Sequence, residues 1–209
     1  EAIHPGFGFL SENSRFARMA QQCGLVFIGP FAQCIDQMGN KAVARSMMIQ
    51  AGVPVIPGSE GVVKNAREAK RLAQKIGYPV MIKAAAGGGG RGMRLARTPE
   101  VFKSMFEAAQ METQSAFGDD GMYLERYIEN ARHIEFQIMA DRQGNVVHLG
   151  ERDCSIQRRN QKMIEESPST ALTPRLRKKM GADAVKAAKA VSYNSAGTVE
   201  FLLTESGEY

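Results

Sequence analysis

The feature that most constrains the fold of this chain is a glycine-rich run at residues 87–92, which reads Gly-Gly-Gly-Gly-Arg-Gly. It lies between two strand-like segments, 79–83 and 93–96, so it forms a tip between two strands. Glycine loses more backbone freedom on folding than any other residue, which makes four in succession costly for a plain hairpin tip. Bare backbone N–H groups, however, can close around phosphate oxygens. We therefore predict a flexible phosphate-binding flap.

Two better-known glycine motifs do not fit this run. Its first, third and last glycines have the spacing of the dinucleotide fingerprint, but that motif opens a helix, whereas residues 93–97 alternate apolar and basic like a strand. A Walker loop needs a lysine where Met93 stands. Lys83 lies four residues ahead of the flap, and its strand directs the ammonium toward an anion held there. The sequence thus predicts phosphate binding by a flap and a strand lysine.

Composition limits the class of protein. Of the 209 residues, 44% are hydrophobic and 23% charged, the balance of a folded globular chain, and no apolar run is long enough to span a membrane. Cys23, Cys34 and Cys154 have no paired spacing, which argues against a disulfide scaffold or a cysteine zinc site and favours a reducing compartment, so we expect a cytoplasmic protein. The net charge of +5, with acidic and basic residues interleaved, favours a small anionic ligand over nucleic acid.

Helices and strands alternate in the first half of the chain. Ser11 or Asn13 can cap a helix that carries Phe16, and residues 25–28 read as a short buried strand. A second helix covers about 41–50, and the prolines and glycine at 54–58 form the best domain boundary in the chain. Beyond it, an asparagine at 65 begins a helix that a glycine at 77 closes.

The second half is richer in strands. Thr98 begins a helix after the flap strands, and residues 122–128 form a strand. Residues 133–139 alternate apolar and polar and lead through a turn at 141–144 into 146–151, which predicts an antiparallel hairpin with one polar face. A helix covers about 174–191, a strand 196–204, and residues 208–209 begin a return strand. The order predicts an α/β fold with α+β character. The abrupt ends of the chain predict a piece of a longer protein.

Three motifs in order carry a family resemblance. Residues 2–13, the flap with Lys83, and residues 151–159, which read Glu-Arg-Asp-Cys-Ser-Ile-Gln-Arg-Arg, together resemble biotin carboxylase, the ATP-grasp component of biotin-dependent carboxylases, most closely the acetyl-CoA carboxylase subunit. The resemblance implies a truncated ATP-grasp fold with a small lid domain that carries the glycine-rich hairpin. It divides the chain into the end of an N-terminal domain and entry to the ATP-grasp (1–54), the lid (55–128) and the start of the C-terminal ATP-grasp subdomain (129–209).

The resemblance also implies a reaction and its participants. Bicarbonate attacks the γ-phosphate of ATP to give carboxyphosphate, and the carboxyl group then passes to a biotin on a carrier protein. Phosphoryl transfer of this kind depends on positioning and on neutralising charge. The implied cofactors are ATP and Mg²⁺ (or Mn²⁺), with biotin as the carrier-bound substrate. The implied partners are a biotin carboxyl carrier protein or domain, a carboxyltransferase component, bicarbonate and, for a full-length protein, a second copy; neither nucleic acid nor membrane is expected.

Site residues are carried over position by position. Lys41 and Lys83 match lysines on the nucleotide phosphates, residues 125–128 match the adenine segment, Lys162 matches the catalytic lysine near bicarbonate, and Glu200 matches a metal ligand. The full set that the resemblance assigns to nucleotide binding is Lys41, Lys83, Gly87, Gly88, Gly89, Gly90, Gly92, Glu125, Arg126, Tyr127, Ile128, His133, Gln157, Asn160 and Leu202.

Two departures and several alternatives accompany the resemblance. Asn160 stands where the family often has histidine, so a titratable role there is lost. The chain stops at Tyr209, before the family's second metal glutamate and its bicarbonate arginine, so we expect weak nucleotide binding and no turnover from this piece alone. The alternatives are a carboxylase domain for pyruvate, propionyl-CoA or methylcrotonyl-CoA, another ATP-grasp ligase such as the large subunit of carbamoyl phosphate synthetase, and, most distantly, a basic nucleic-acid-binding domain.

Overall fold

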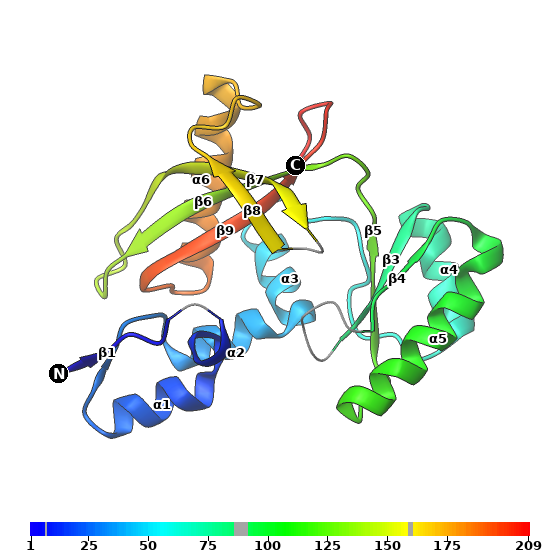
Figure 1. Cartoon of the computed structure of the whole chain (residues 1–209), viewed down its shortest axis with the longest axis horizontal. Coiled ribbons are helices and arrows are strands. Elements are labelled where there is room, and N and C mark those ends of the chain that lie inside the picture. The colour runs from blue at the N-terminus through cyan, green and yellow to red at the C-terminus, as the bar shows by residue number, and fades with distance from the viewer. Residues whose placement is uncertain (7, 86–91, 159–160) are drawn as a thin grey trace. The chain divides into compact units, whose positions relative to one another are not determined.

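A computed structural model describes residues 1–6, 8–85, 92–158 and 161–209 of the chain. It divides into two compact units (Figure 1). Unit 1 comprises Glu1–Gly39, Met47–Pro54 and Ala131–Tyr209, and unit 2 comprises Asn40–Ser46 and Val55–Asn130. One border between the units lies between Pro54 and Val55, and a short segment ahead of it, Asn40–Ser46, also belongs to unit 2.

The N-terminal part of unit 1 is a small helical assembly on a parallel strand pair. Its elements are β1 (Ala2–Ile3), the 3₁₀ helix η1 (Phe9–Glu12), α1 (Ser14–Gln22), β2 (Val26–Phe27) and α2 (Ala32–Gly39), followed by α3 (Lys41–Gln50), which crosses the border. Asn13 is the cap of α1, since its side chain accepts from the N–H of Phe16. A strand is present within the predicted range 25–28 but has only two residues; Phe27 is buried as expected, whereas Val26 is 46% exposed, so the strand is buried on one face only.

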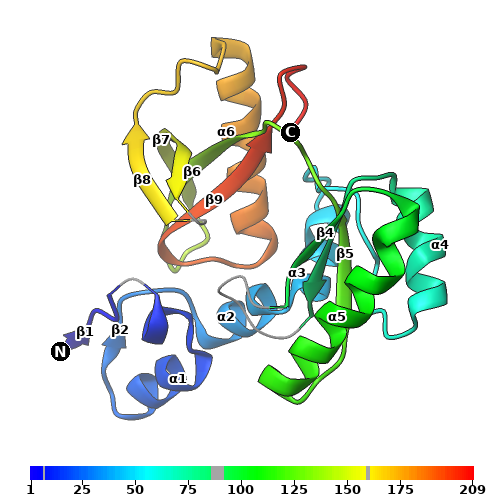
Figure 2. The same ribbon diagram turned by 45° about the vertical axis from the view of Figure 1, so that its right-hand side comes forward.

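Unit 2 is a three-stranded antiparallel sheet with two helices on one face. The elements are α4 (Ala66–Ile76), β3 (Val80–Ala84), β4 (Arg94–Ala96), α5 (Pro99–Phe117) and β5 (Met122–Arg126), with strand order β4-β3-β5. Figure 2 shows α4 and α5 on the same side of these strands. Fully buried side chains of the sheet, such as Ile82 and Leu124, pack with Phe102 and Phe106 of α5. Asn65 caps α4 as predicted by accepting from two backbone N–H groups.

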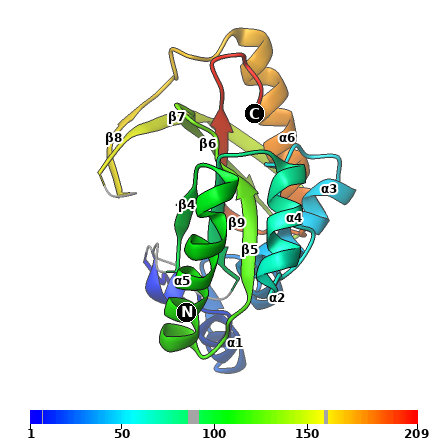
Figure 3. The ribbon, with the colours of Figure 1, turned by 90° about the vertical axis from the view of Figure 1, so that its right-hand side faces the viewer.

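The C-terminal part of unit 1 is a four-stranded antiparallel sheet covered by one helix. Strands β6 (Arg132–Ala140), β7 (Val146–Arg158), β8 (Gln161–Glu166) and β9 (Ser195–Leu203) run in the order β8-β7-β6-β9, and α6 (Pro174–Ala190) packs on one face. Figure 3 shows α6 on one side of the sheet and β8 at its far edge. Ile134, Phe136 and Ile138 are at most 1% exposed beneath α6, which confirms the predicted alternation. The opposite face of β6 carries polar side chains.

The last residues do not form the predicted return strand. The chain turns back on itself after β9, and the backbone N–H of Thr204 donates to the carbonyl of Glu208. Tyr209 then packs edge-on against Phe201, with ring centroids 5.6 Å apart, and its hydroxyl donates to Asp183 of α6 at 2.7 Å. The C-terminal tyrosine is thus held against the α6 core by a turn, and the expectation of a strand at 208–209 was wrong.

Candidate functional site

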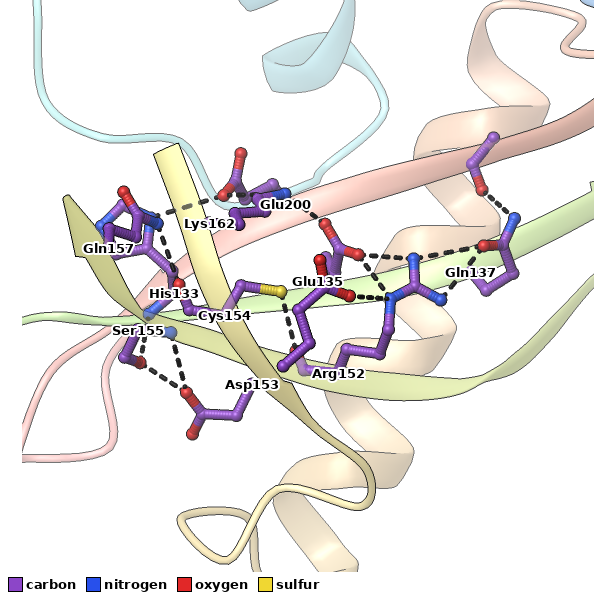
Figure 4. Close-up of polar contacts among 12 residues, drawn as sticks. His133, Glu135, Gln137, Arg152, Asp153, Cys154, Ser155, Gln157, Lys162 and Glu200 are labelled. Carbon is purple, nitrogen blue, oxygen red and sulfur yellow. Dashed lines mark hydrogen bonds and ion pairs between the residues drawn. The ribbon is translucent and has the colours of Figure 1, made fainter. Parts of the chain in front are cut away.

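Strand register places a row of charged side chains across the polar face of the unit 1 sheet. In β6, Glu135 pairs directly with Glu200 of β9 on one side and with Arg152 of β7 on the other. Directly paired residues point to the same face of a sheet, so these three side chains lie side by side (Figure 4). Side chains alternate along β6, so these three lie on the face of the sheet opposite α6. The antiparallel pairing of β6 with β7 and with β9 therefore places them in one row.

Lys162 of β8 reaches into the row. Its Nζ lies 2.5 Å from Oε2 of Glu135 and 3.6 Å from Oε1 of Glu200. Burial alone would raise the pKa of the Glu135 carboxyl, but hydrogen bonds from Lys162 and Arg152 outweigh it and hold that pKa below its usual range. Although burial opposes the charged ammonium, the same carboxylates hold the pKa of Lys162 above its usual value. The lysine is thus a fixed cation.

Three further predicted site residues lie on the same sheet. His133 is the register partner of Leu202, and its Nδ1 lies 3.4 Å from Oε1 of Glu200. Gln157 is the register partner of Lys162 on the β7–β8 pair and donates to the carbonyl of Cys154 at 3.0 Å. The structure therefore brings His133, Gln157, Lys162, Glu200 and Leu202 together on one sheet. Asn160 lies outside the described residues.

Sequence reasoning missed two members of this site, Glu135 and Arg152. Glu135 was assigned to a polar face, whereas its side chain is only 5% exposed because two cations cover it. The signal was present in the sequence: Glu135 follows His133 at the two-residue spacing of one strand face, and Arg152 lies within the motif at 151–159.

A possible cation site adjoins this row and does not suit a metal. Glu135, Cys154 and Glu165 offer ligand atoms within 4.8 Å of one another. Both oxygens of Glu135, however, already bind cationic side chains. Burial, with the charge of Glu135 adding to it, raises the pKa of the Cys154 thiol to about 11, so the thiol stays protonated at neutral pH. Glu200 is a better candidate for a metal ligand, because its side chain is 45% exposed and offers the carboxylate oxygen that Mg²⁺ prefers.

Unit 2 carries its own pair of lysines. Nζ of Lys83 in β3 lies 2.5 Å from Oε2 of Glu125 on the neighbouring strand β5. Lys41, at the start of α3, donates to the carbonyl of Ala84 at 3.1 Å. Burial lowers the pKa of Lys41, and the positive charge of Lys83 lowers it further. The carboxylate of Glu125 offsets part of the repulsion between the two ammonium groups, and the three groups together keep one net positive charge, which favours an anion.

The predicted adenine segment begins at Glu125 and continues through Arg126, Tyr127 and Ile128. The backbone N–H of Arg126 donates to the carbonyl of Pro57 at 2.7 Å, and that of Tyr127 donates to the carbonyl of Pro79 at 2.9 Å. These two N–H groups are therefore used to fix the segment. A contact between adenine and the backbone of this segment would then use its carbonyl groups or its remaining N–H groups.

The described part of the glycine run is its last residue. Gly92 is buried, and its N–H donates to Oε1 of Glu112 in α5 at 3.2 Å. Its carbonyl accepts from the N–H of Ala84 at 3.0 Å and closes the base of the β3–β4 connection. In this arrangement Gly92 fastens one end of the predicted flap to α5. Gly87, Gly88, Gly89 and Gly90 lie outside the described residues.

Two family models match the chain in succession. Residues 1–35 match "Biotin carboxylase, N-terminal domain", and residues 40–209 match "Carbamoyl-phosphate synthase L chain, ATP binding domain". The second match covers the whole of unit 2 and the four-stranded sheet with α6. The two charged clusters described above therefore both lie within a family of ATP-binding domains.

Curated relatives align with the chain over almost its full length. It is 60% identical to "Biotin carboxylase" of Nostoc sp. over 100% of this chain and 46% of that protein. It is 58% identical to "Biotin carboxylase 1, chloroplastic" of Populus trichocarpa over 99% of this chain and 39% of that protein. The 2-oxoglutarate carboxylase small subunit of Hydrogenobacter thermophilus is 55% identical over 99% of the chain. The chain spans less than half the length of these relatives.

Among the described residues, no helix has the length and apolar character needed to cross a membrane. The relatives include chloroplastic proteins.

Solved structures agree in fold. The biotin carboxylase of Campylobacter jejuni, in a complex described as β-γ-ATP, matches with a TM-score of 0.93 at 50% identity over 99% of this chain and 46% of that one. The biotin carboxylase domain dimer of the Hydrogenobacter thermophilus 2-oxoglutarate carboxylase, with MgADP, ADP and bicarbonate, matches with a TM-score of 0.92 at 55% identity over 100% of this chain and 46% of that one. With both family models in succession and relatives of this name along its whole length, the chain belongs to the biotin carboxylase family and has its ATP-grasp fold.

Proposed function

We propose that this chain is part of a longer enzyme that carboxylates biotin with bicarbonate at the expense of ATP, through carboxyphosphate. The observation that carries the proposal is the fixed cation Lys162 between Glu135 and Glu200 on a chain 60% identical to a biotin carboxylase. A lysine held in place beside a half-exposed carboxylate is suited to position an anionic nucleophile next to a metal-bound phosphate.

In this proposal the two lysines of unit 2 bind the nucleotide phosphates. The charges of Lys83 and Lys41 oppose each other, Glu125 offsets part of that repulsion, and a bound anion would relieve the rest. The flap at 87–92 contributes backbone N–H groups and belongs to the lid at 55–128, while residues 125–128 and Leu202 contact adenine. Gly92, whose N–H already binds Glu112, would anchor the flap instead of binding phosphate.

The unit 1 residues would then serve the metal and bicarbonate. Glu200 supplies one oxygen ligand to Mg²⁺ or Mn²⁺, which when bound neutralises phosphate charge. Lys162 holds bicarbonate, Gln157 lies beside it on the neighbouring strand, and His133 orients the Glu200 carboxylate from 3.4 Å. These residues belong to the proposed C-terminal subdomain at 129–209, and residues 1–54 form the proposed N-terminal part.

Phosphate release by the full-length protein tests this function. We expect release that requires Mg²⁺ and bicarbonate and increases on addition of free biotin. Lys162→Met should lower kcat/KM at least a hundredfold, whereas Lys186→Met, which removes a lysine paired with Asp183 on α6, should change it less than threefold. Biotin-independent phosphate release, or equal effects of the two variants, would contradict the proposal. The 209-residue chain alone should show no biotin-dependent release.

We further propose acetyl-CoA as the final acyl acceptor and a cytoplasmic location. The relatives named simply biotin carboxylase reach 60% identity, against 55% for a 2-oxoglutarate carboxylase subunit and 52% for a pyruvate carboxylase subunit. The partners would be a biotin carboxyl carrier protein, a carboxyltransferase and a second copy of the full-length protein, since a related domain is described as a dimer. Affinity purification of the full-length protein tests this: recovery of a carboxyltransferase that acts on pyruvate or 2-oxoglutarate would contradict the acceptor assigned here.

A further inference from the structure

Each oxygen of Glu135 binds a different cation. Oε2 lies 2.5 Å from Nζ of Lys162, and Oε1 lies 2.6 Å from Nε and 2.5 Å from Nη2 of Arg152. Figure 4 shows the two cations approaching the carboxylate from β8 and β7. The Glu135 side chain is 5% exposed, so water contributes little to its solvation. Lys162 is therefore one of two counter-charges to this buried carboxylate.

The second cation changes the net charge beside Lys162. A carboxylate paired with one ammonium is neutral as a pair and attracts an anion weakly. Arg152 adds a further positive charge, so Glu135, Lys162 and Arg152 together carry one net positive charge. Glu165 lies 3.3 Å from Nε of Arg152 and Glu200 lies 3.6 Å from Nζ of Lys162; both carboxylates are more than 40% exposed, so water weakens their attraction for the two cations without abolishing it. With Arg152 present, Lys162 therefore keeps more positive charge for an anion than it would as the sole partner of Glu135.

Gln137 holds the guanidinium of Arg152 in place. Its Oε1 accepts from Nη1 and Nη2 of Arg152, both at 3.2 Å. Its Nε2 donates to the carbonyl of Gly197 in β9 at 2.9 Å, which fixes the amide across the strand pair. The guanidinium therefore has a fixed acceptor on the edge next to the one that binds Glu135.

We propose that Arg152, oriented by Gln137, is a positioning residue that shares the charge of Glu135 and so keeps Lys162 free to attract a small oxyanion such as bicarbonate. The assignment of the anion rests on the proposed function. Without Arg152, Glu135 would pair with Lys162 alone. The carboxylate would then offset the full charge of the ammonium, which would attract an anionic substrate only weakly. Arg152 acts in this role through its positive charge more than through the planar, two-pronged shape of its guanidinium group.

Steady-state kinetics of the full-length protein test this inference. We expect Arg152→Gln to raise KM for bicarbonate at least tenfold while KM for ATP changes less than threefold, and Arg152→Lys to restore KM for bicarbonate to within threefold of the parent. The matched control is Arg132→Gln. Arg132 also pairs with a nearly buried carboxylate of the same sheet, Asp153, at 3.2 Å, so its removal likewise takes a cation from a buried acid. Asp153 then keeps the hydrogen bonds from Ser155 and Ser169. The control should change KM for bicarbonate less than twofold.

Equal effects of Arg152→Gln and Arg132→Gln, no effect of Arg152→Gln, or failure of Arg152→Lys to restore KM would overturn the inference. If the full-length protein shows no bicarbonate-dependent turnover, the proposed function fails and a second measurement decides the inference. Bicarbonate is titrated into the full-length protein labelled with [ε-¹³C]lysine, and the Lys162 signal, assigned with Lys162→Arg, is followed. Tenfold weaker binding in Arg152→Gln alone supports the inference, and identical titrations in parent and both variants, including no binding in any, overturn it.

Discussion

Gly92→Ala should destabilise the chain more than a glycine replacement in an open turn. Gly92 has a φ of +65°, and a Cβ built on it would lie 2.4 Å from Oγ1 of Thr113 and 3.1 Å from Cβ of Ala84. Thr113 is fully buried, and its hydroxyl donates to the carbonyl of Ala109 at 2.7 Å, so it cannot turn aside without losing that bond. The substitution therefore combines backbone strain with overpacking.

The magnitude follows from these two effects. A non-glycine residue in the left-handed region costs roughly 1–2 kcal/mol, and overpacking a well-filled site costs a further ~1–3 kcal/mol. We therefore expect the free energy of unfolding to fall by roughly 2–5 kcal/mol in Gly92→Ala. Gly144→Ala is the control: φ there is +89°, and no atom lies within 4 Å of the added Cβ, so only the backbone strain applies.

Urea unfolding followed by circular dichroism measures both variants. A third variant isolates the steric contribution, because Thr113→Ala removes the oxygen that the new Cβ would meet. Thr113→Ala should change the free energy of unfolding more favourably, by at least ~1 kcal/mol, in the Gly92→Ala background than in the parent chain. Residues in direct contact show coupling energies on the order of 0.5–3 kcal/mol in such double-mutant cycles. Equal losses in Gly92→Ala and Gly144→Ala, or strict additivity of the two changes, would refute the reasoning.

Three other outcomes follow from single contacts. Lys83→Met should weaken ATP binding to the full-length protein at least tenfold by calorimetry, whereas Lys103→Met, which removes a surface ammonium 3.7 Å from Glu107, should change it less than twofold. Asn65→Ala should lower the free energy of unfolding by about 1 kcal/mol in urea, because the first turn of α4 loses its cap. Burial opposes ionisation of Glu135, but its two cationic partners depress the pKa, so its stabilisation is present above about pH 4.3 and lost as the pH falls through the folded-state pKa. Glu135→Gln should therefore flatten the loss of stability in acid, and an unchanged acid limb would contradict this.

Elements whose side chains alternate between core and solvent were predictable from the sequence. The alternation of β6 and the caps of α1 and α4 each depend on residues close together in the chain. Strand β8 was missed because all six of its residues are exposed, so no burial pattern marks it. Helix α2 was missed because it is short and buries only Ala32 and Cys34.

The site was only half predictable, for a different reason. Lys162 and Glu200 were found through motif resemblance. The burial of Glu135, however, depends on Arg152 and Lys162, which lie 17 and 27 residues further along the chain on other strands. Local pattern cannot reveal that two cations from such strands will cover a carboxylate on a nominally exposed face. The role of Gly92 was likewise hidden, since its close approach to Thr113 of α5 depends on tertiary packing.

The chemistry on one face of the unit 1 sheet depends on packing against the other. Because side chains alternate with a period of two, a one-residue slip of β6 would turn Glu135 into the α6 core and Phe136 outward. The register is held from the apolar face, where Phe136 contacts Phe201 of β9 and His148 of β7 edge-on, with ring centroids 6.0 and 5.5 Å apart. These rings join the same three strands that carry Glu200, Glu135 and Arg152. The aromatic contacts beneath the sheet therefore hold the register that places Glu200, Glu135 and Arg152 side by side above it, and Lys162 joins this row from β8.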